Sequence, residues 1–216
     1  MLTLDPFYPI VPDTAWLERL LPQGIKLVQL RIKDTAPNTL KAEIARAVEL
    51  CAAYDCQLIV NDYWREAIAT GADFVHLGQE DLKAADLSAV RAAGMRIGIS
   101  THSEDERALA LRADPDYIAL GPIYPTKLKA MPWAPQGLQR ITQWRGQIAC
   151  PLVAIGGITL QSVGDVLAAG ADSAAVITDI VTSEDPETQT QNWLRATQAW
   201  RDLSTDASDH ARHNVT

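Results

Sequence analysis

Three polar residues, Gln29, Arg31 and Lys33, alternate with apolar residues in one short run of the sequence. Side chains of a β-strand alternate between its two faces, so these three are expected on the same face. Strands of a parallel sheet are usually apolar on both faces, and a cationic face there is unfavourable unless an anion or a cavity meets it. The run therefore predicts an anion site, in which Arg31 offers a bidentate fork and Lys33 a point charge suited to phosphate.

Two aspartates, Asp62 and Asp81, each follow a short apolar run and are candidate metal ligands. Mg²⁺ in proteins is commonly held by one or two carboxylates together with substrate phosphates and water. The competing interpretation is that each aspartate caps the helix after it, which for one aspartate alone is the better explanation. Two aspartates at adjacent strand ends, facing cations on the neighbouring strand, favour a Mg²⁺ site.

Other polar residues at predicted strand ends extend this site. Ser100 is suited to hydrogen-bond a ligand, and Lys129 lies in a long loop and is a further phosphate-binding candidate. Gly157 exposes backbone N–H groups, and Ile177-Thr178 follows the next strand, which together indicate a second phosphate site. The histidines His76 and His102 are predicted to be structural, because lone histidines near strand ends usually serve as satisfied polar groups.

The elements that must position these residues alternate between strand and helix along the chain. Short β-type runs separated by helical periodicity predict parallel pairing with right-handed crossovers, and eight such units predict a single-domain α/β fold, a (β/α)₈ TIM barrel. A doubly wound open sheet is the alternative, but no Gly-rich fingerprint follows the first strand. The predicted strands are Tyr8–Val11, Lys26–Arg31, Gln57–Asn61, Phe74–Leu77, Arg96–Ser100, Tyr117–Leu120, Leu152–Ile155 and Ser173–Ile177. The predicted helices are Thr14–Leu21, Leu40–Tyr54, Trp64–Thr70, Asp86–Ala93, Glu104–Leu111, Leu138–Arg145, Leu160–Ala168 and Glu187–Leu203.

Two segments depart from this alternation. The connection Pro122–Gln136 is long and Pro-rich, which is more typical of an active-site lid than of a passive link. Residues 204–216 are polar and aperiodic, so the barrel is expected to span residues 1–203 and the remainder to be a disordered tail.

Composition narrows the function. The 216 residues carry a net charge of −8, which argues against a nucleic-acid or membrane-surface binder, and no apolar run is long enough to span a bilayer. The three cysteines match no metal-ligand spacing and indicate reduced thiols in a cytoplasmic protein. The oligomeric state stays open, with a homo-oligomer among the alternatives. Two phosphate sites, one metal site and no evident nucleophile predict transfer of a group activated by pyrophosphate, catalysed by electrostatic positioning.

These residues resemble the thiamine-phosphate synthase (thiamine-phosphate pyrophosphorylase) family from Val28 to about Asp185. The shared motifs are Gln29-x-Arg31-x-Lys33, Val60-Asn-Asp62, His76-Leu-Gly-Gln-Glu-Asp81, Gly98-Ile-Ser-Thr-His102, Gly121-Pro-Ile-Tyr-Pro-Thr126, Ala154-Ile-Gly-Gly-Ile158 and Ala175-Val-Ile-Thr178. The resemblance implies a (β/α)₈ barrel that joins 4-amino-2-methyl-5-hydroxymethylpyrimidine diphosphate to a thiazole phosphate and releases pyrophosphate. It implies a dissociative mechanism, in which pyrophosphate leaves before the thiazole nitrogen captures a pyrimidine methyl cation.

The resemblance also implies a role for each matching residue. Gln29, Arg31, Lys33 and Asn61 line the pyrimidine diphosphate site, and Asp62 and Asp81 hold Mg²⁺ against the pyrophosphate. Ser100 and Lys129 contact the departing pyrophosphate. The thiazole phosphate is bound by Thr126, Gly157, Ile177 and Thr178.

One position departs from the family pattern. The family's loop usually reads Pro-Thr-x-Thr-Lys, whereas this sequence has Leu128 in place of the second hydroxyl. This departure predicts a weaker thiazole phosphate contact. Two alternatives to the synthase remain open, of which only the second draws support from Leu128. One is a thiazole tautomerase of the same superfamily, whose members generally lack the second metal aspartate. The other is a catalytically inactive barrel that senses thiamine phosphates.

Overall fold

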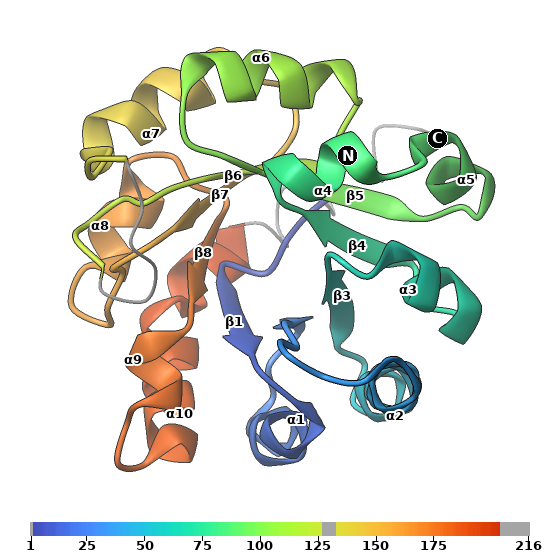
Figure 1. Cartoon of the computed structure of the whole chain (residues 1–216). Helices are drawn as coiled ribbons and strands as arrows, with labels where there is room; N and C mark the ends of the chain where they lie inside the picture. Colours follow the sequence, from blue (N-terminus) through green and yellow to red (C-terminus); the bar gives the residue numbers. More distant parts are fainter. Residues whose placement is uncertain (1, 127–132, 204–216) are drawn as a thin grey trace, which may run out of the picture.

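The barrel predicted from the sequence is closed. The computed structural model describes residues 2–126 and 133–203, and its eight parallel strands pair in chain order, with β8 returning to β1 (Figure 1). This topology excludes the doubly wound open sheet. The strands are β1 (Phe7–Val11), β2 (Leu27–Leu30), β3 (Gln57–Asn61), β4 (Phe74–Leu77), β5 (Arg96–Thr101), β6 (Tyr117–Leu120), β7 (Leu152–Ile155) and β8 (Ser173–Val176).

Helices form a ring around the strands (Figure 1). Two short helices, α4 and α9, were not expected, because each follows a strand end within a few residues and has too few positions to show a helical period. The last predicted helix is divided, since α10 ends at Ala196 and helical residues resume over 198–203. The helices are α1 (Thr14–Leu20), η1 (Leu21–Gln23), α2 (Pro37–Ala53), α3 (Trp64–Thr70), α4 (Gln79–Ala84), α5 (Leu87–Ala92), α6 (Glu104–Arg112), α7 (Gly137–Arg145), α8 (Val163–Ala168), α9 (Thr178–Val181) and α10 (Pro186–Ala196).

The period of two in the strands divides the apolar residues into two cores. The outer core lies between strands and helices and includes Val28, Leu30 and Ile32. The inner core fills the barrel and includes Tyr8 and Tyr117. The polar residues that alternate with Val28 and Leu30 therefore face the barrel interior and its mouth, as their spacing predicted.

Two sequence-based expectations fall on other parts of the chain. Lys127, Leu128 and Lys129 of the predicted lid, and the predicted tail 204–216, lie outside the described residues. Within the described ranges, none of the helices has both the length and the apolar character needed to cross a membrane.

Candidate active site

A cavity opens at the mouth of the barrel, near the carboxyl ends of the strands. Its volume is about 90 Å³, and its polar lining comes from β1 to β5: Tyr8, Gln29, Arg31, Asn61, His76 and Ser100. Its apolar lining includes Ile177, which follows β8. Five of the predicted site residues therefore meet in one cavity, at the end of the barrel where enzymes of this fold carry their chemistry.

Arg31 connects this cavity with a second one. The strand β2 ends at Leu30, one residue earlier than predicted, but the Arg31 N–H still donates to the Val11 carbonyl at 2.8 Å. Arg31 thus keeps the alternation of the strand and lines the barrel cavity. Together with Lys33, it also lines a cavity of about 550 Å³ beside the loops after β1 and β2. The two predicted cations therefore stand at the rim, with room for an anion beside them.

Asp62 is the acidic centre of this rim. Its carboxylate accepts hydrogen bonds from Lys33 Nζ at 3.2 Å and from Asn61 Nδ2 at 2.5 Å. The Asp62 side chain is 19% exposed, and its backbone is left-handed with φ of 65°. The carboxylate of Asp62 therefore lies beside Lys33, a cation that follows the adjacent strand, as the sequence predicted.

Asp81 lies on α4, and its carboxyl group interacts with that of Asp62. Burial, followed by the negative charge of Asp62, raises the pKa of Asp81 above its usual range. A raised pKa means that the folded protein disfavours the second negative charge. A cation between the two groups would relieve that repulsion.

The helix-capping alternative is not supported at either aspartate. The N-cap of α3 is Tyr63 and that of α4 is Gly78, and neither helix start has a side-chain cap hydrogen bond. Neither aspartate is an N-cap residue, although Asp81 lies in the first turn of α4 and its carboxylate accepts a hydrogen bond from its own backbone N–H. Two carboxylates do not amount to a complete metal site, and the described residues contain no cluster of three or more His, Cys, Asp or Glu that could hold a metal ion.

Ser100 lies on β5 and is bound to His76, which the sequence predicted to be structural. His76 Nε2 lies 2.7 Å from Ser100 Oγ, and His76 Nδ1 lies 2.7 Å from Tyr117 Oη. Burial lowers the pKa of His76 to about 4, so the ring is neutral near pH 7. His102 fits the structural role better, since its Nδ1 lies 2.8 Å from Glu106 Oε2.

The predicted thiazole phosphate residues come from two neighbouring loops. Gly157 has φ of 68°, and a Cβ there would lie 2.6 Å from the Pro125 carbonyl oxygen. Tyr124 N donates to Gly156 O at 2.9 Å, so the loops after β6 and β7 run together up to Thr126. Thr178 begins α9 and is exposed, while Lys129 lies outside the described residues.

Sequence reasoning gave no site role to Tyr8, Tyr117 or Gln79. Both tyrosines are buried in the barrel, and Gln79 Nε2 donates to the Ser100 carbonyl at 2.6 Å. The sequence could have predicted that each tyrosine faces the barrel interior, from its position on its strand. It could not have predicted that Tyr8 and Tyr117 contact each other, because 109 residues separate them.

Comparison with known proteins identifies the family. A family model described as thiamine monophosphate synthase matches residues 7–180. The thiamine-phosphate synthase of Rhizobium etli is 58% identical over 203 residues, which cover 94% of this chain and all of that protein. The chain belongs to the thiamine monophosphate synthase family. The Escherichia coli O1:K1 thiamine-phosphate synthase is 48% identical over 191 residues, covering 88% of this chain and 87% of that protein.

A solved structure agrees with this thiamine monophosphate synthase assignment. The thiamine phosphate pyrophosphorylase from Pyrococcus furiosus superposes with a TM-score of 0.81 at 27% identity, covering 91% of this chain and 96% of that one. Membership of the family makes the chain a transferase of thiamine biosynthesis, as the sequence motifs predicted.

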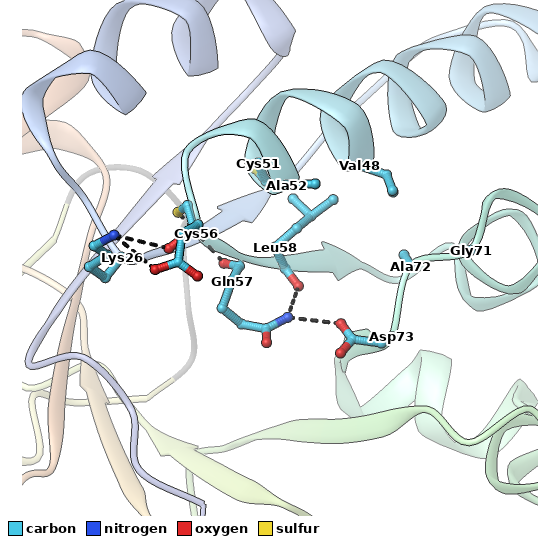
Figure 2. Close-up of a pocket in the computed structure, with 11 residues that line it drawn as sticks. Lys26, Val48, Cys51, Ala52, Cys56, Gln57, Leu58, Gly71, Ala72 and Asp73 are labelled. Carbon is cyan, nitrogen blue, oxygen red and sulfur yellow. Dashed lines mark hydrogen bonds and ion pairs between the residues drawn. The ribbon is translucent and has the colours of Figure 1, made fainter.

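A cavity at the opposite end of the barrel does not compete with this thiamine monophosphate synthase site. It has a volume of about 520 Å³ and lies where β2, β3 and β4 begin (Figure 2). Its polar groups are engaged with one another. Lys26 Nζ binds Asp55 Oδ2 at 3.2 Å, and Gln57 Nε2 donates to Asp73 Oδ1 at 2.8 Å. Groups at this end of a TIM barrel usually serve stability.

Proposed function

We propose that this transferase joins 4-amino-2-methyl-5-hydroxymethylpyrimidine diphosphate to 4-methyl-5-(2-phosphooxyethyl)thiazole, giving thiamine phosphate and pyrophosphate. The observation that carries the proposal is the barrel mouth, where a cavity lined by Gln29, Arg31, Asn61 and Ser100 borders the Lys33–Asp62 pair. Family membership supplies the reaction class, and these residues supply the groups it needs.

The chemistry is dissociative. The bond between the pyrimidine methylene carbon and the diphosphate oxygen breaks, and the oxygen keeps the electron pair. The methyl cation that remains is stabilised by electron donation from the aminopyrimidine ring. The lone pair of the thiazole nitrogen then forms the new C–N bond. Because no covalent enzyme intermediate is involved, catalysis depends on stabilising the charge of the leaving group.

Cationic and polar groups serve the leaving diphosphate. Arg31 and Lys33 face it from the end of β2, Ser100 donates from β5, and Lys129, which lies outside the described residues, is assigned the same role from its place in the sequence. Gln29 and Asn61 bind the pyrimidine. Cations are unusually effective at such a site, because water is largely excluded from a narrow cavity and electrostatic interactions are strong there.

Asp62 and Asp81 fit a Mg²⁺ ion. Both offer hard oxygen ligands, their interaction disfavours two adjacent negative charges, and the diphosphate completes a typical Mg²⁺ ligand set. Bound Mg²⁺ supplies positive charge that neutralises the diphosphate oxygens. Lys33 and Asn61 orient the Asp62 carboxylate toward that position through their hydrogen bonds.

The second substrate is assigned to the opposite side of the mouth. Gly157, Ile177 and Thr178, with Thr126 from the loop after β6, bind the phosphate of the thiazole. The close approach of Gly157 to the Pro125 carbonyl supports this assignment, because it sets the loop after β7 beside Thr126. A cytoplasmic location is part of the proposal, because the spacing of Cys51, Cys56 and Cys150 matches no metal site and is typical of reduced thiols.

A coupled assay tests the proposal. The protein is mixed with both substrates and Mg²⁺, and pyrophosphate and the fluorescent thiochrome derivative of the product are measured, with and without EDTA. Both products are expected with Mg²⁺, and neither with EDTA. Binding of both substrates by calorimetry without pyrophosphate release contradicts the proposal and favours a sensor. Thiazole isomerisation without pyrophosphate release, retained in Asp81→Ala, favours the tautomerase.

A further inference from the structure

A continuous row of hydrogen bonds crosses the inside of the barrel. Gln29 Nε2 lies 2.8 Å from Tyr8 Oη, and Tyr8 Oη lies 3.0 Å from Tyr117 Oη. Tyr117 Oη then lies 2.7 Å from His76 Nδ1, and His76 Nε2 lies 2.7 Å from Ser100 Oγ. We call these five side chains the relay. Both ends of the relay, Gln29 and Ser100, line the active-site cavity.

The three interior residues of the relay are buried, and Tyr8 and His76 also line the active-site cavity. Tyr8 and Tyr117 are 1% and 0% exposed, and His76 is 7% exposed. The Tyr117 ring stacks on His76 with centroids 5.6 Å apart. A Cβ at Gly98 would lie 2.1 Å from Tyr117 Cζ, so β5 has no side chain where the ring must fit. The space left at Gly98 thus admits the Tyr117 ring, whose hydroxyl lies between Tyr8 and His76.

Only two directions of such a row use every tyrosine proton within it, because in any other pattern one tyrosine accepts from both neighbours and its buried O–H is left unpaired. Each hydroxyl has one proton to donate, and a neutral imidazole donates through one nitrogen and accepts through the other. When Gln29 donates to Tyr8, each group donates onward and the Ser100 proton stays free. When Ser100 donates to His76, every bond reverses and Gln29 accepts. The directions at the two ends are therefore linked, although Gln29 and Ser100 make no bond to each other.

We propose that Tyr8, Tyr117 and His76 are positioning residues that couple the amide orientation of Gln29 to the hydroxyl orientation of Ser100. This rests on the proposed function, because substrate chemistry selects the direction. An aminopyrimidine presents an N–H donor, which the Gln29 carbonyl accepts only when the amide nitrogen faces Tyr8. In that direction Ser100 also keeps its proton for a diphosphate oxygen. In the reverse direction the Gln29 amide N–H would face the aminopyrimidine N–H. A lone pair of Ser100 Oγ would then face the diphosphate oxygen.

Binding of inorganic pyrophosphate tests the coupling, because pyrophosphate reports on the Ser100 end alone. Tyr8→Phe removes a hydroxyl that contacts Gln29 and Tyr117 but not Ser100. We expect calorimetry with Mg²⁺ present to show about fivefold weaker pyrophosphate binding, since part of one charge-assisted hydrogen bond is lost. In the Ser100→Ala background the same change should have no effect on pyrophosphate. Unchanged binding in the Tyr8→Phe variant, or an equal loss in both backgrounds, overturns the proposal.

Thr101→Val is the matched control. Thr101 is next to Ser100 on β5, is 0% exposed, and donates to the Ala119 carbonyl at 2.9 Å, outside the relay. Its loss should lower the melting temperature and leave pyrophosphate binding unchanged. If Tyr8→Phe does not fold, Tyr117→Phe gives the same readout. Turnover of the unaltered chain tests the proposed function separately, since pyrophosphate binding is measured without turnover.

Discussion

At the scale of single residues, Asp62 shows how the site is held. Its left-handed backbone, with φ of 65°, is uncommon outside glycine, although aspartate tolerates it better than most residues. The Asp62 N–H donates to the His76 carbonyl at 2.8 Å, which ties the turn to β4. Asn61 and Lys33 then fix the carboxylate from two sides. The unfavourable backbone conformation of Asp62 therefore occurs where it directs the carboxylate toward the rim of the barrel.

Asp62→Ala separates a chemical role from a structural one. Turnover should fall about a hundredfold or more, because Asp62 would hold the Mg²⁺ that neutralises the leaving diphosphate. Its pair with Lys33, whose side chain is 47% exposed, contributes little to stability. Steady-state kinetics and a thermal melt check this, and a large drop in melting temperature would indicate a structural role instead.

Asp81→Asn tests the acidic pair. Burial and then Asp62 raise the pKa of Asp81, so the ionised form destabilises the fold as pH rises through that pKa. At pH 7 the asparagine variant should therefore melt higher than the parent without metal, and the difference should fade below the usual pKa of about 3.9. Added Mg²⁺ should raise the melting temperature of the parent more than that of the variant. An equal rise in both would remove Asp81 from the metal site.

Leu128→Thr tests the departure from the family's loop pattern. A hydrogen bond from a hydroxyl to a charged group is worth about 1.5–3 kcal/mol. Restoring it should lower the KM for the thiazole phosphate by about tenfold or more. The KM for the pyrimidine diphosphate should stay the same. An unchanged or higher KM for the thiazole phosphate would show that Lys127 or another group has taken over this contact.

At the scale of elements, the features that the sequence predicted correctly are those determined by residues close together in the chain. Four strands, including β3 and β6, have the predicted bounds, because a run of adjacent apolar residues marks a buried strand. The alternation of Gln29 and Arg31 with Leu30 likewise put the polar groups in the mouth. The contacts of His76 could not be predicted from the sequence, because its partners Tyr117 and Ser100 lie 41 and 24 residues away.

Gly98→Ala tests the fit between β5 and β6. The new methyl group would lie 2.1 Å from Tyr117 Cζ, which forces the ring to move. Such overpacking costs about 3 kcal/mol, so the melting temperature should fall by about 6–12 °C. Gly164→Ala on α8 is the control, since its Cβ would lie 3.8 Å from Trp200. It should be neutral or stabilising. A neutral Gly98→Ala would mean that the ring is free to relocate.

At the scale of the whole molecule, closure of the barrel depends on the two ends of the described chain. The strand β1 pairs with β8, with Phe7 opposite Ala174. Asp5, just before β1, binds Arg201 through two hydrogen bonds of 2.7 and 2.8 Å. The Asp5 carbonyl also accepts from Ser173 Oγ at 2.7 Å. The last helical residues are thereby bound to the first strand at the end of the barrel opposite the active site.

Asp5→Asn measures the value of this closure. The Asp5 side chain is 8% exposed and that of Arg201 is 21% exposed, so loss of the charge leaves a half-buried guanidinium without its carboxylate. The cost should be about 2 kcal/mol, below that of a fully buried pair, and the melting temperature should fall by about 4–8 °C. Asp55→Asn is the control, because Asp55 pairs with Lys26 at 97% exposure and should leave the melting temperature unchanged. Turnover at 25 °C should be unaffected in both, since the pair lies far from the rim. A loss of turnover in Asp5→Asn below its melting temperature would show that closure of the barrel base shapes the mouth.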